Sequence, residues 1–128
     1  MGTVGQVSRV GVAADNLRME AIAVFCTCPD EASAARIADA LVGEHLAACV
    51  NRIAGIASTY HWKGQIQNDG EVLLLIKSVR PCFEALRKRI LTLHPYELPE
   101  VIAVDIAMGH VPYLDWIAAQ TASDASTR

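Results

Sequence analysis

Residues 49–78, CVNRIAGIASTYHWKGQIQNDGEVLLLIKS, decide the fold of this chain. Residues 49–62 are rich in β-branched and aromatic side chains, which favours a long strand, and Gly55 in its middle predicts a bulge or bend. The Lys-Gly and Asn-Asp-Gly sequences within residues 63–70 supply turn chemistry. Residues 71–78 then form a second, apolar strand. The segment therefore predicts a β-hairpin.

The residues before the hairpin predict a strand and a helix. Residues 21–26, AIAVFC, form a short continuous apolar run that Pro29 closes, as expected of a strand buried on both faces. Asp30 offers a side-chain oxygen to cap the helix that follows. Residues on the predicted buried face of this helix recur at helical spacing, and they are Ala34, Ile37, Ala38, Leu41, Val42 and His45.

The residues after the hairpin predict a second helix, a fourth strand and a short final helix. Pro81 suits the first turn of the second helix, which ends near His94 because Pro95 disfavours helical geometry in the residue before it. Residues 101–107 predict the strand and residues 112–119 the final helix. This order predicts an α+β fold of ferredoxin-like βαββαβ topology, with an antiparallel sheet and an extra C-terminal helix.

Length and composition indicate one domain. The chain has 128 residues, of which 52% are hydrophobic, which is enough for one core and too little for two ordinary domains. Residues 1–18 show no sustained apolar period and are predicted to be a flexible extension, which leaves residues 19–128 as the folded domain. No apolar run is long enough to cross a bilayer, so no membrane association is expected.

Charge and cysteine content narrow the class of protein further. A net charge of −3, with the basic residues scattered, provides no surface for a phosphate backbone and argues against a nucleic-acid partner. No secretory signal is visible, and four cysteines in such a chain are more typical of thiols in a reducing compartment than of a disulfide framework. A cytoplasmic location is expected.

The predicted sheet has a surface that two helices leave uncovered. Three of its four strands are apolar at consecutive positions, so both faces of the sheet must be removed from water. Two helices cover only one face, and the short final helix is too small to cover the other. An apolar face of that size is an association site, and symmetric self-association is the simplest way to cover it.

The cysteines are the first candidates for chemistry. Cys26 and Cys28 lie two apart at the end of the first strand, so their sulfurs share a face if the strand persists, whereas a break at Pro29 would turn Cys28 away. Packing as a small buried hydrophobe is the competing interpretation for Cys26, and more so for Cys49. Cys82 lies in the first turn of a helix, where the helix dipole would favour a reactive thiolate, and packing as a partly buried neighbour of the helix cap is the preferred competing interpretation.

Two histidines stand beside aromatic residues. His94 follows the second helix, and its imidazole could bond the last carbonyls of that helix or bind a metal; the sequence leaves both open. His61, between Tyr60 and Trp62, is expected to face solvent, opposite to the two aromatics.

No enzyme class has positive support. The sequence contains no nucleophile elbow, phosphate-binding loop, dinucleotide fingerprint or zinc-protease motif. An RNA-binding domain of the same topology would need aromatic residues on its central strands, and residues 71–78 contain none. A hydrolase with Asp105 or Glu97 as its base ranks last among the hypotheses.

Several spaced motifs, in register from Ala21 to Thr121, resemble the CutA divalent-cation tolerance proteins. The resemblance implies a ferredoxin-like fold, a tight homotrimer similar in architecture to the PII signalling proteins, and an association with copper and other divalent ions. The segments that carry it are residues 26–34 (CTCPDEASA), 46–50 (LAACV), 60–64 (YHWKG), 71–77 (EVLLLIK), 94–100 (HPYELPE) and 113–117 (YLDWI).

The resemblance also implies metal ligands. Copper-binding members use a cysteine at the end of the first strand and two adjacent histidines before Pro-Tyr, positions that correspond here to Cys26, Leu93 and His94. One histidine is therefore missing, and Cys26 with His94 gives fewer ligands than a stable site needs.

The leading hypothesis from the sequence is a homotrimeric, non-enzymatic protein that binds copper, or another divalent ion such as zinc, through Cys26 and His94. Tyr60, Trp62 and Tyr96 are expected to help build its subunit contacts. The alternative is a PII-like trimeric regulatory module that binds a small anion or a partner protein in the clefts between subunits.

Overall fold

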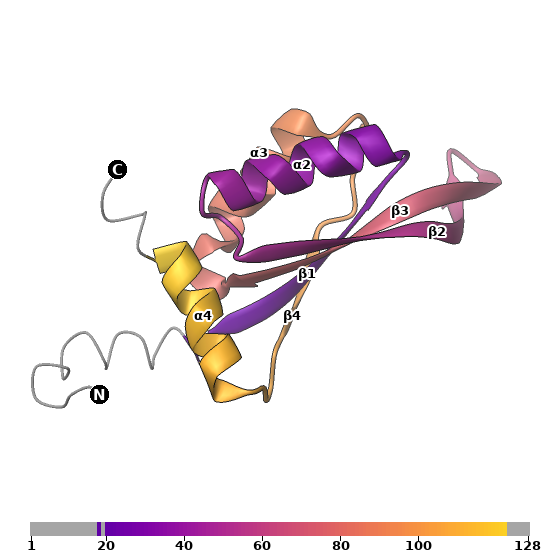
Figure 1. The fold of residues 1–128 in the computed structure, drawn as a ribbon. Helices are drawn as coiled ribbons and strands as arrows, with labels where there is room; N and C mark the ends of the chain where they lie inside the picture. Colours follow the sequence, from indigo (N-terminus) through magenta and orange to yellow (C-terminus); the bar gives the residue numbers. More distant parts are fainter. Residues whose placement is uncertain (1–17, 19, 123–128) are drawn as a thin grey trace, which may run out of the picture.

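The structure is a computed structural model, and it describes Arg18 and residues 20–122. Four antiparallel strands form one sheet in the order β2-β3-β1-β4, with two helices above one face and a third helix at one end (Figure 1). This arrangement confirms the predicted α+β fold with an antiparallel sheet. The elements are β1 (Ala21–Cys28), α2 (Glu31–Gly43), β2 (Cys49–Trp62), β3 (Gln65–Val79), the 3₁₀ turn η1 (Arg80–Cys82), α3 (Phe83–Leu93), β4 (Ile102–Asp105) and α4 (Val111–Ala122).

Most of the predicted extension, residues 1–18, lies outside the described residues. Its last residue, Arg18, is described, and its Nε donates a hydrogen bond of 2.7 Å to Asp115 Oδ1 on α4. Both side chains are partly exposed, so this ion pair adds little to stability.

The hairpin of β2 and β3 follows the predicted bounds of β2, including its bulge. The pairing register shifts between Ile53 and Ile56, and Gly55 between them has φ of +81°. A backbone dihedral in that range suits glycine, which has no Cβ to clash. The predicted bulge is therefore confirmed.

The turn of the hairpin is shorter than predicted. Lys63 (φ +52°) and Gly64 (φ +79°) close it alone, as a two-residue turn with both central residues in the left-handed region. Residues 68–70 were expected to belong to the turn, but they pair with residues 57–59 inside the sheet. That expectation is wrong because Lys63 adopts a left-handed conformation that is typical of Asn, Asp or Gly. The turn therefore ends at Gly64, and β3 begins at Gln65.

Replacing Gly64 by alanine is expected to lower the free energy of unfolding by about 1–2 kcal/mol, because the left-handed conformation is less stable by that amount for a residue with a Cβ. A Cβ would meet no other atom within 4 Å, so the cost comes from the backbone alone. Urea unfolding measures it. The matched control is Gly43→Ala, a helical position that is equally open, where stability should rise by up to about 1 kcal/mol. Equal stability of Gly64→Ala and the parent would mean that the turn has another geometry.

The outer part of the hairpin is a two-stranded arm. Residues 56–62 of β2 pair with residues 65–71 of β3, whereas β1 pairs with β3 only from Val72 onward. The arm therefore extends past the four-stranded part of the sheet (Figure 1). A lone pair of strands is marginally stable in water.

Helix α2 begins where the sequence predicts. The Ser33 amide donates to Asp30 Oδ1 at 2.8 Å, and this cap holds the pKa of the Asp30 carboxyl below its usual value. Its buried residues are Ser33, Ala34, Ile37, Ala38 and Leu41. Two residues predicted for that face are elsewhere: Val42 is 41% exposed, and His45 lies beyond the end of the helix with φ of +60°.

The elements after the hairpin differ from the predicted bounds at their ends. Pro81 lies in η1, just before α3, and not in the first turn of α3 itself. Strand β4 covers residues 102–105 where residues 101–107 were expected, and α4 covers residues 111–122 where 112–119 were expected. These shifts of one to three residues leave the topology unchanged.

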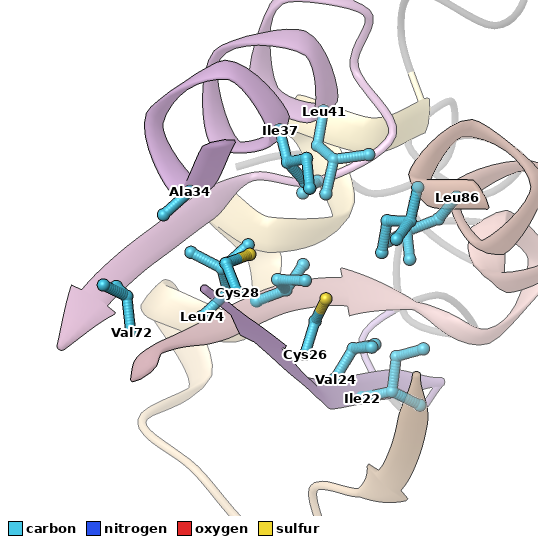
Figure 2. Close-up of a cluster of buried hydrophobic side chains, with 13 residues drawn as sticks. Ile22, Val24, Cys26, Cys28, Ala34, Ile37, Leu41, Val72, Leu74 and Leu86 are labelled. Atoms are coloured by element: carbon cyan, nitrogen blue, oxygen red, sulfur yellow. The ribbon is translucent and has the colours of Figure 1, made fainter. Parts of the chain in front are cut away.

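The core lies between the sheet and the helices α2 and α3. Figure 2 shows the side chains of β1 and β3 on this face, including Cys26 and Cys28, opposite those of the two helices. All of the largest members are fully buried, so the cluster dominates the stability of the fold. They are Val24, Ile37, Leu41, Leu74, Ile76, Leu86 and Ile90.

The opposite face of the sheet is only partly covered. Helix α4 packs over one end of it, where Leu114 and Ile117 meet Ala21, Ala48 and Val79. The rest, which we call the open face, contains partly buried and exposed apolar side chains on all four strands. They are Ala23, Phe25, Ile53, Leu73, Leu75, Ile102 and Val104, of which Ile53, Ile102 and Val104 are 42–55% exposed.

Candidate metal centre

Cys26 and Cys28 lie side by side on the buried face of β1. The strand persists through Cys28, which pairs with Val72, just as Cys26 pairs with Leu74. Residues two apart in a strand point to the same face, and both thiols are 0% exposed. The break at Pro29 therefore comes too late to turn Cys28 away.

His94 reaches the same place from the end of α3. Pro95 ends the helix, and the extended backbone of His94 turns its ring inward, where it is 8% exposed. The Tyr96 amide donates to His94 Nδ1 at 3.1 Å, so the ring proton is on Nε2, which donates to the Thr27 carbonyl oxygen at 2.7 Å. The imidazole thus bonds Thr27 of β1 and Tyr96 of the following loop, and not the carbonyls of its own helix.

These three side chains form one compact group of metal-ligand type. The two thiol sulfurs and an imidazole nitrogen all lie within 4.8 Å of one another. Leu93, where the resemblance implies a histidine, is partly buried against the core cluster. The structure therefore brings together the predicted pair, Cys26 and His94, and adds Cys28, which the sequence left undecided. The signal for Cys28 was the C-x-C spacing itself.

The electrostatics of the group favour one thiolate. A hydrogen bond from the Cys26 thiol, helped by His94, lowers the pKa of Cys28 to about 6 in spite of burial. The same hydrogen bond, together with burial, raises the pKa of Cys26. Burial lowers the pKa of His94, but hydrogen bonds with Cys28 and the Thr27 carbonyl outweigh it, so the net shift is upward. The two shifts favour the thiolate form of Cys28 over that of Cys26.

The donor set fits a thiophilic metal ion. Zinc–sulfur bonds are about 2.3 Å and zinc–nitrogen bonds about 2.0–2.1 Å, so the ligand atoms around one tetrahedral ion lie about 3.4–3.8 Å apart. The observed atoms, all within 4.8 Å of one another, would move together by up to about 1 Å to hold an ion. His94 would give up one of its two present hydrogen bonds to expose a nitrogen lone pair. Thiolate and imidazole suit copper and zinc better than magnesium or calcium.

A groove of about 690 Å³ lies on the arm of the hairpin and is bordered by Thr27 and residues 95–98. Within it, Glu71 is 7% exposed and accepts a hydrogen bond of 2.5 Å from the Tyr96 hydroxyl. Burial and this carboxylate raise the pKa of Tyr96. The residues that line the groove combine aromatic rings with acidic groups, and they include Tyr60, Trp62, Glu71, Tyr96, Glu97 and Glu100.

The remaining candidate residues are spread over the molecule. His61 is exposed, as predicted, although it also lines the groove together with Tyr60 and Trp62. Glu97 lines that groove, whereas Asp105 is exposed, forms an ion pair with Arg80 and lines a separate pocket, so the two carboxylates offered as a hydrolase base do not meet. Cys82 is partly buried at the start of α3, away from the metal-ligand group.

Comparison with known proteins gives one consistent family. A family model described as CutA1 divalent ion tolerance protein matches residues 22–120. The divalent-cation tolerance protein CutA of Thermus thermophilus is 47% identical over 98 residues, which are 77% of this chain and 95% of that protein. Protein CutA of Homo sapiens is 48% identical over 101 residues, which are 79% of this chain but 56% of the human protein.

Solved structures agree with this match. A structure of the Thermus thermophilus divalent cation tolerance protein is 46% identical and has a TM-score of 0.78, covering 79% of this chain and 98% of that one. A structure named as the periplasmic divalent cation tolerance protein CutA of Archaeoglobus fulgidus is 32% identical, with a TM-score of 0.77, and covers 79% and 98%. Within Arg18 and residues 20–122, no helix is long and apolar enough to cross a membrane.

Proposed function

The chain belongs to the CutA1 divalent ion tolerance family, and from that premise we propose that it is a homotrimeric, non-enzymatic protein that binds copper or a related divalent ion. One observation carries the metal part of the proposal: Cys26 and His94, predicted as ligands, lie within 4.8 Å of each other in a buried group. Thiolate and imidazole donors are those that copper and zinc prefer.

The open face supports the trimeric part of the proposal. Isoleucine, valine, leucine and phenylalanine side chains from four strands form a continuous apolar surface that α4 covers only at one end. Soluble proteins rarely leave such a surface in water, and a second copy of the chain is the simplest cover. Tyr60, Trp62 and Tyr96, the predicted contact residues, all line the adjoining groove and keep that role in the proposal.

We place the protein in the cytoplasm within this proposal. Cys26, Cys28, Cys49 and Cys82 carry thiols and form no disulfide with one another. Thiols persist in a reducing compartment, and the metal-ligand group depends on them.

Metal titration tests the function. Reduced protein should bind about one Cu or Zn ion per chain, and Cys26→Ala or His94→Ala should weaken binding by more than about 100-fold, because removal of even an outer partner of a metal ligand costs 10–100-fold. Cys49→Ala, on the other face of the sheet, is the matched control and should bind like the parent. Equal binding by all four proteins would remove this ligand assignment.

The second candidate function is a PII-like regulatory module that binds a small ligand or a partner protein in clefts between subunits. The aromatic and acidic groove of about 690 Å³ favours it, since ligand sites combine ring surfaces with a few fixed polar groups. Titration with nucleotides and small acids, followed by the fluorescence of Trp62 in a Trp116→Phe background, separates the two. A saturable response in metal-free protein, lost in Tyr96→Phe, would favour the regulatory function.

A further inference from the structure

We propose that Cys28 is the third ligand of this centre, so that a single chain holds a thiophilic ion, Cu(I) or Zn(II), through two sulfurs and one nitrogen. This inference rests on the proposed metal-binding function and adds to it a ligand and a class of ion. Cys26 and His94 alone provide two ligands, and a stable site needs three or four.

The backbone fixes the position of the third donor. Strand β1 is hydrogen-bonded to β3 along its whole length and to β4 along half of it, so Cys26 and Cys28 cannot turn apart without breaking the sheet. Figure 2 shows both sulfurs between the sheet and the helices. The Thr27 carbonyl and the Tyr96 amide hold the ring of His94, and one of these two bonds is released when a ring nitrogen binds an ion. The two sulfurs are therefore preorganised, which lowers the entropic cost of binding an ion.

The apolar surroundings of the two sulfurs favour a bound cation. Cys26 and Cys28 belong to the apolar core cluster, with Val24 and Ile37 as fellow members. A thiolate in such surroundings is costly unless a positive charge compensates it. A bound cation supplies that charge.

The donor types select the ion. The group contains no oxygen donor, and Mg²⁺, Ca²⁺ and Mn²⁺ prefer carboxylates, carbonyls and water. Two sulfurs and an imidazole instead suit soft Cu(I) and borderline Zn(II). Structural Zn²⁺ sites take four ligands, so zinc here would need one more from outside the group, whereas Cu(I) is satisfied with fewer.

The groove lies near the ligands along the chain, since it is lined by Thr27, between the two cysteines, and by Tyr96, two residues after His94. The Thr27 side chain is on the other face of β1 from the two sulfurs. The carboxylates of the groove, Glu71, Glu97 and Glu100, give it a negative potential, which raises the local concentration of cations.

Competitive titration of the full-length, reduced protein tests the inference, with Cu(I) and Zn(II) as probes and Mn(II) as the oxygen-preferring comparison. Cys28→Ser should weaken binding of Cu(I) and Zn(II) by more than about 100-fold, similarly to Cys26→Ser, because each removes a direct ligand. Cys49→Ser is the matched control and should bind like the parent. Mn(II) should bind at least 100-fold more weakly than Zn(II). Mn(II) binding as tight as Zn(II), lost in Cys28→Ser, would overturn the assigned class of ion.

X-ray absorption of the loaded parent gives a readout that needs no variant and so stays valid if Cys28→Ser fails to fold. Two sulfurs in the first coordination shell of Cu(I) or Zn(II) support the inference. One sulfur, or unchanged affinity in folded Cys28→Ser, overturns it and leaves the proposed function standing with Cys26 and His94. A parent that binds none of the three ions overturns the proposed function, and the inference with it.

Discussion

A chain in which Leu75 is replaced by glutamate is expected to fold and to sediment as a monomer, whereas the parent is expected to sediment as the proposed trimer. Leu75 lies on the open face, paired with Phe25 of the neighbouring strand β1, and is only partly buried within one chain. In an apolar contact between chains an unpaired carboxylate costs several kcal/mol. At about 1.4 kcal/mol per factor of ten, association weakens by about 100-fold or more.

Sedimentation equilibrium at micromolar concentration measures this change. Val42→Glu places the same charge on the outer side of α2, where Val42 is already 41% exposed, and should leave the parent assembly intact. Circular dichroism shows whether both variants are folded. A parent that is monodisperse as a monomer would contradict the proposal that the open face joins copies of the chain.

The second large effect is expected in the core. Leu74→Ala should lower the free energy of unfolding by about 2–5 kcal/mol, because it removes buried methyl groups and leaves a cavity that the sheet and helices cannot close. Leu74 is 0% exposed and belongs to the cluster between β3, α2 and α3. Denaturant unfolding at one fixed protein concentration gives the value, since the proposed association with other copies would also contribute to stability.

An exposed leucine provides the comparison. Leu91 on α3 is 45% exposed, and Leu91→Ala should change the free energy of unfolding by no more than about 0.5 kcal/mol. Similar losses in Leu74→Ala and Leu91→Ala would mean that the helices do not pack on this face of β3 as described.

The sequence predicted those parts of the fold whose signals are local. The β-branched run of β2, the bulge at Gly55 and the cap at Asp30 each depend on residues a few positions apart, and all three are confirmed. The turn was misplaced because Lys63 adopts a positive φ that its residue type does not announce. Only the pairing of β2 with β3 across the arm reveals it.

The candidate site was predicted in part for a different reason. The family resemblance predicts Cys26 and His94 together as ligands, and the structure places their ligand atoms within 4.8 Å although the residues are 68 positions apart in the sequence. Whether Cys28 joins them depends on one residue more or less of strand before Pro29. That length is decided by pairing with Val72 on β3, a partner far away in the sequence, so no local pattern could settle it.

Hydrogen exchange in the two-stranded arm should report on whether the chain is associated with other copies. Each backbone amide there has a single neighbouring strand to hold it, so fraying inward from Lys63 costs little while a chain is alone. Deuterium from the solvent would then enter the arm quickly and the central strands slowly. If other copies pack against the arm, the difference in exchange rate between the arm and the central strands should shrink. The deuterium content of the arm would then measure the fraction of chains that are associated.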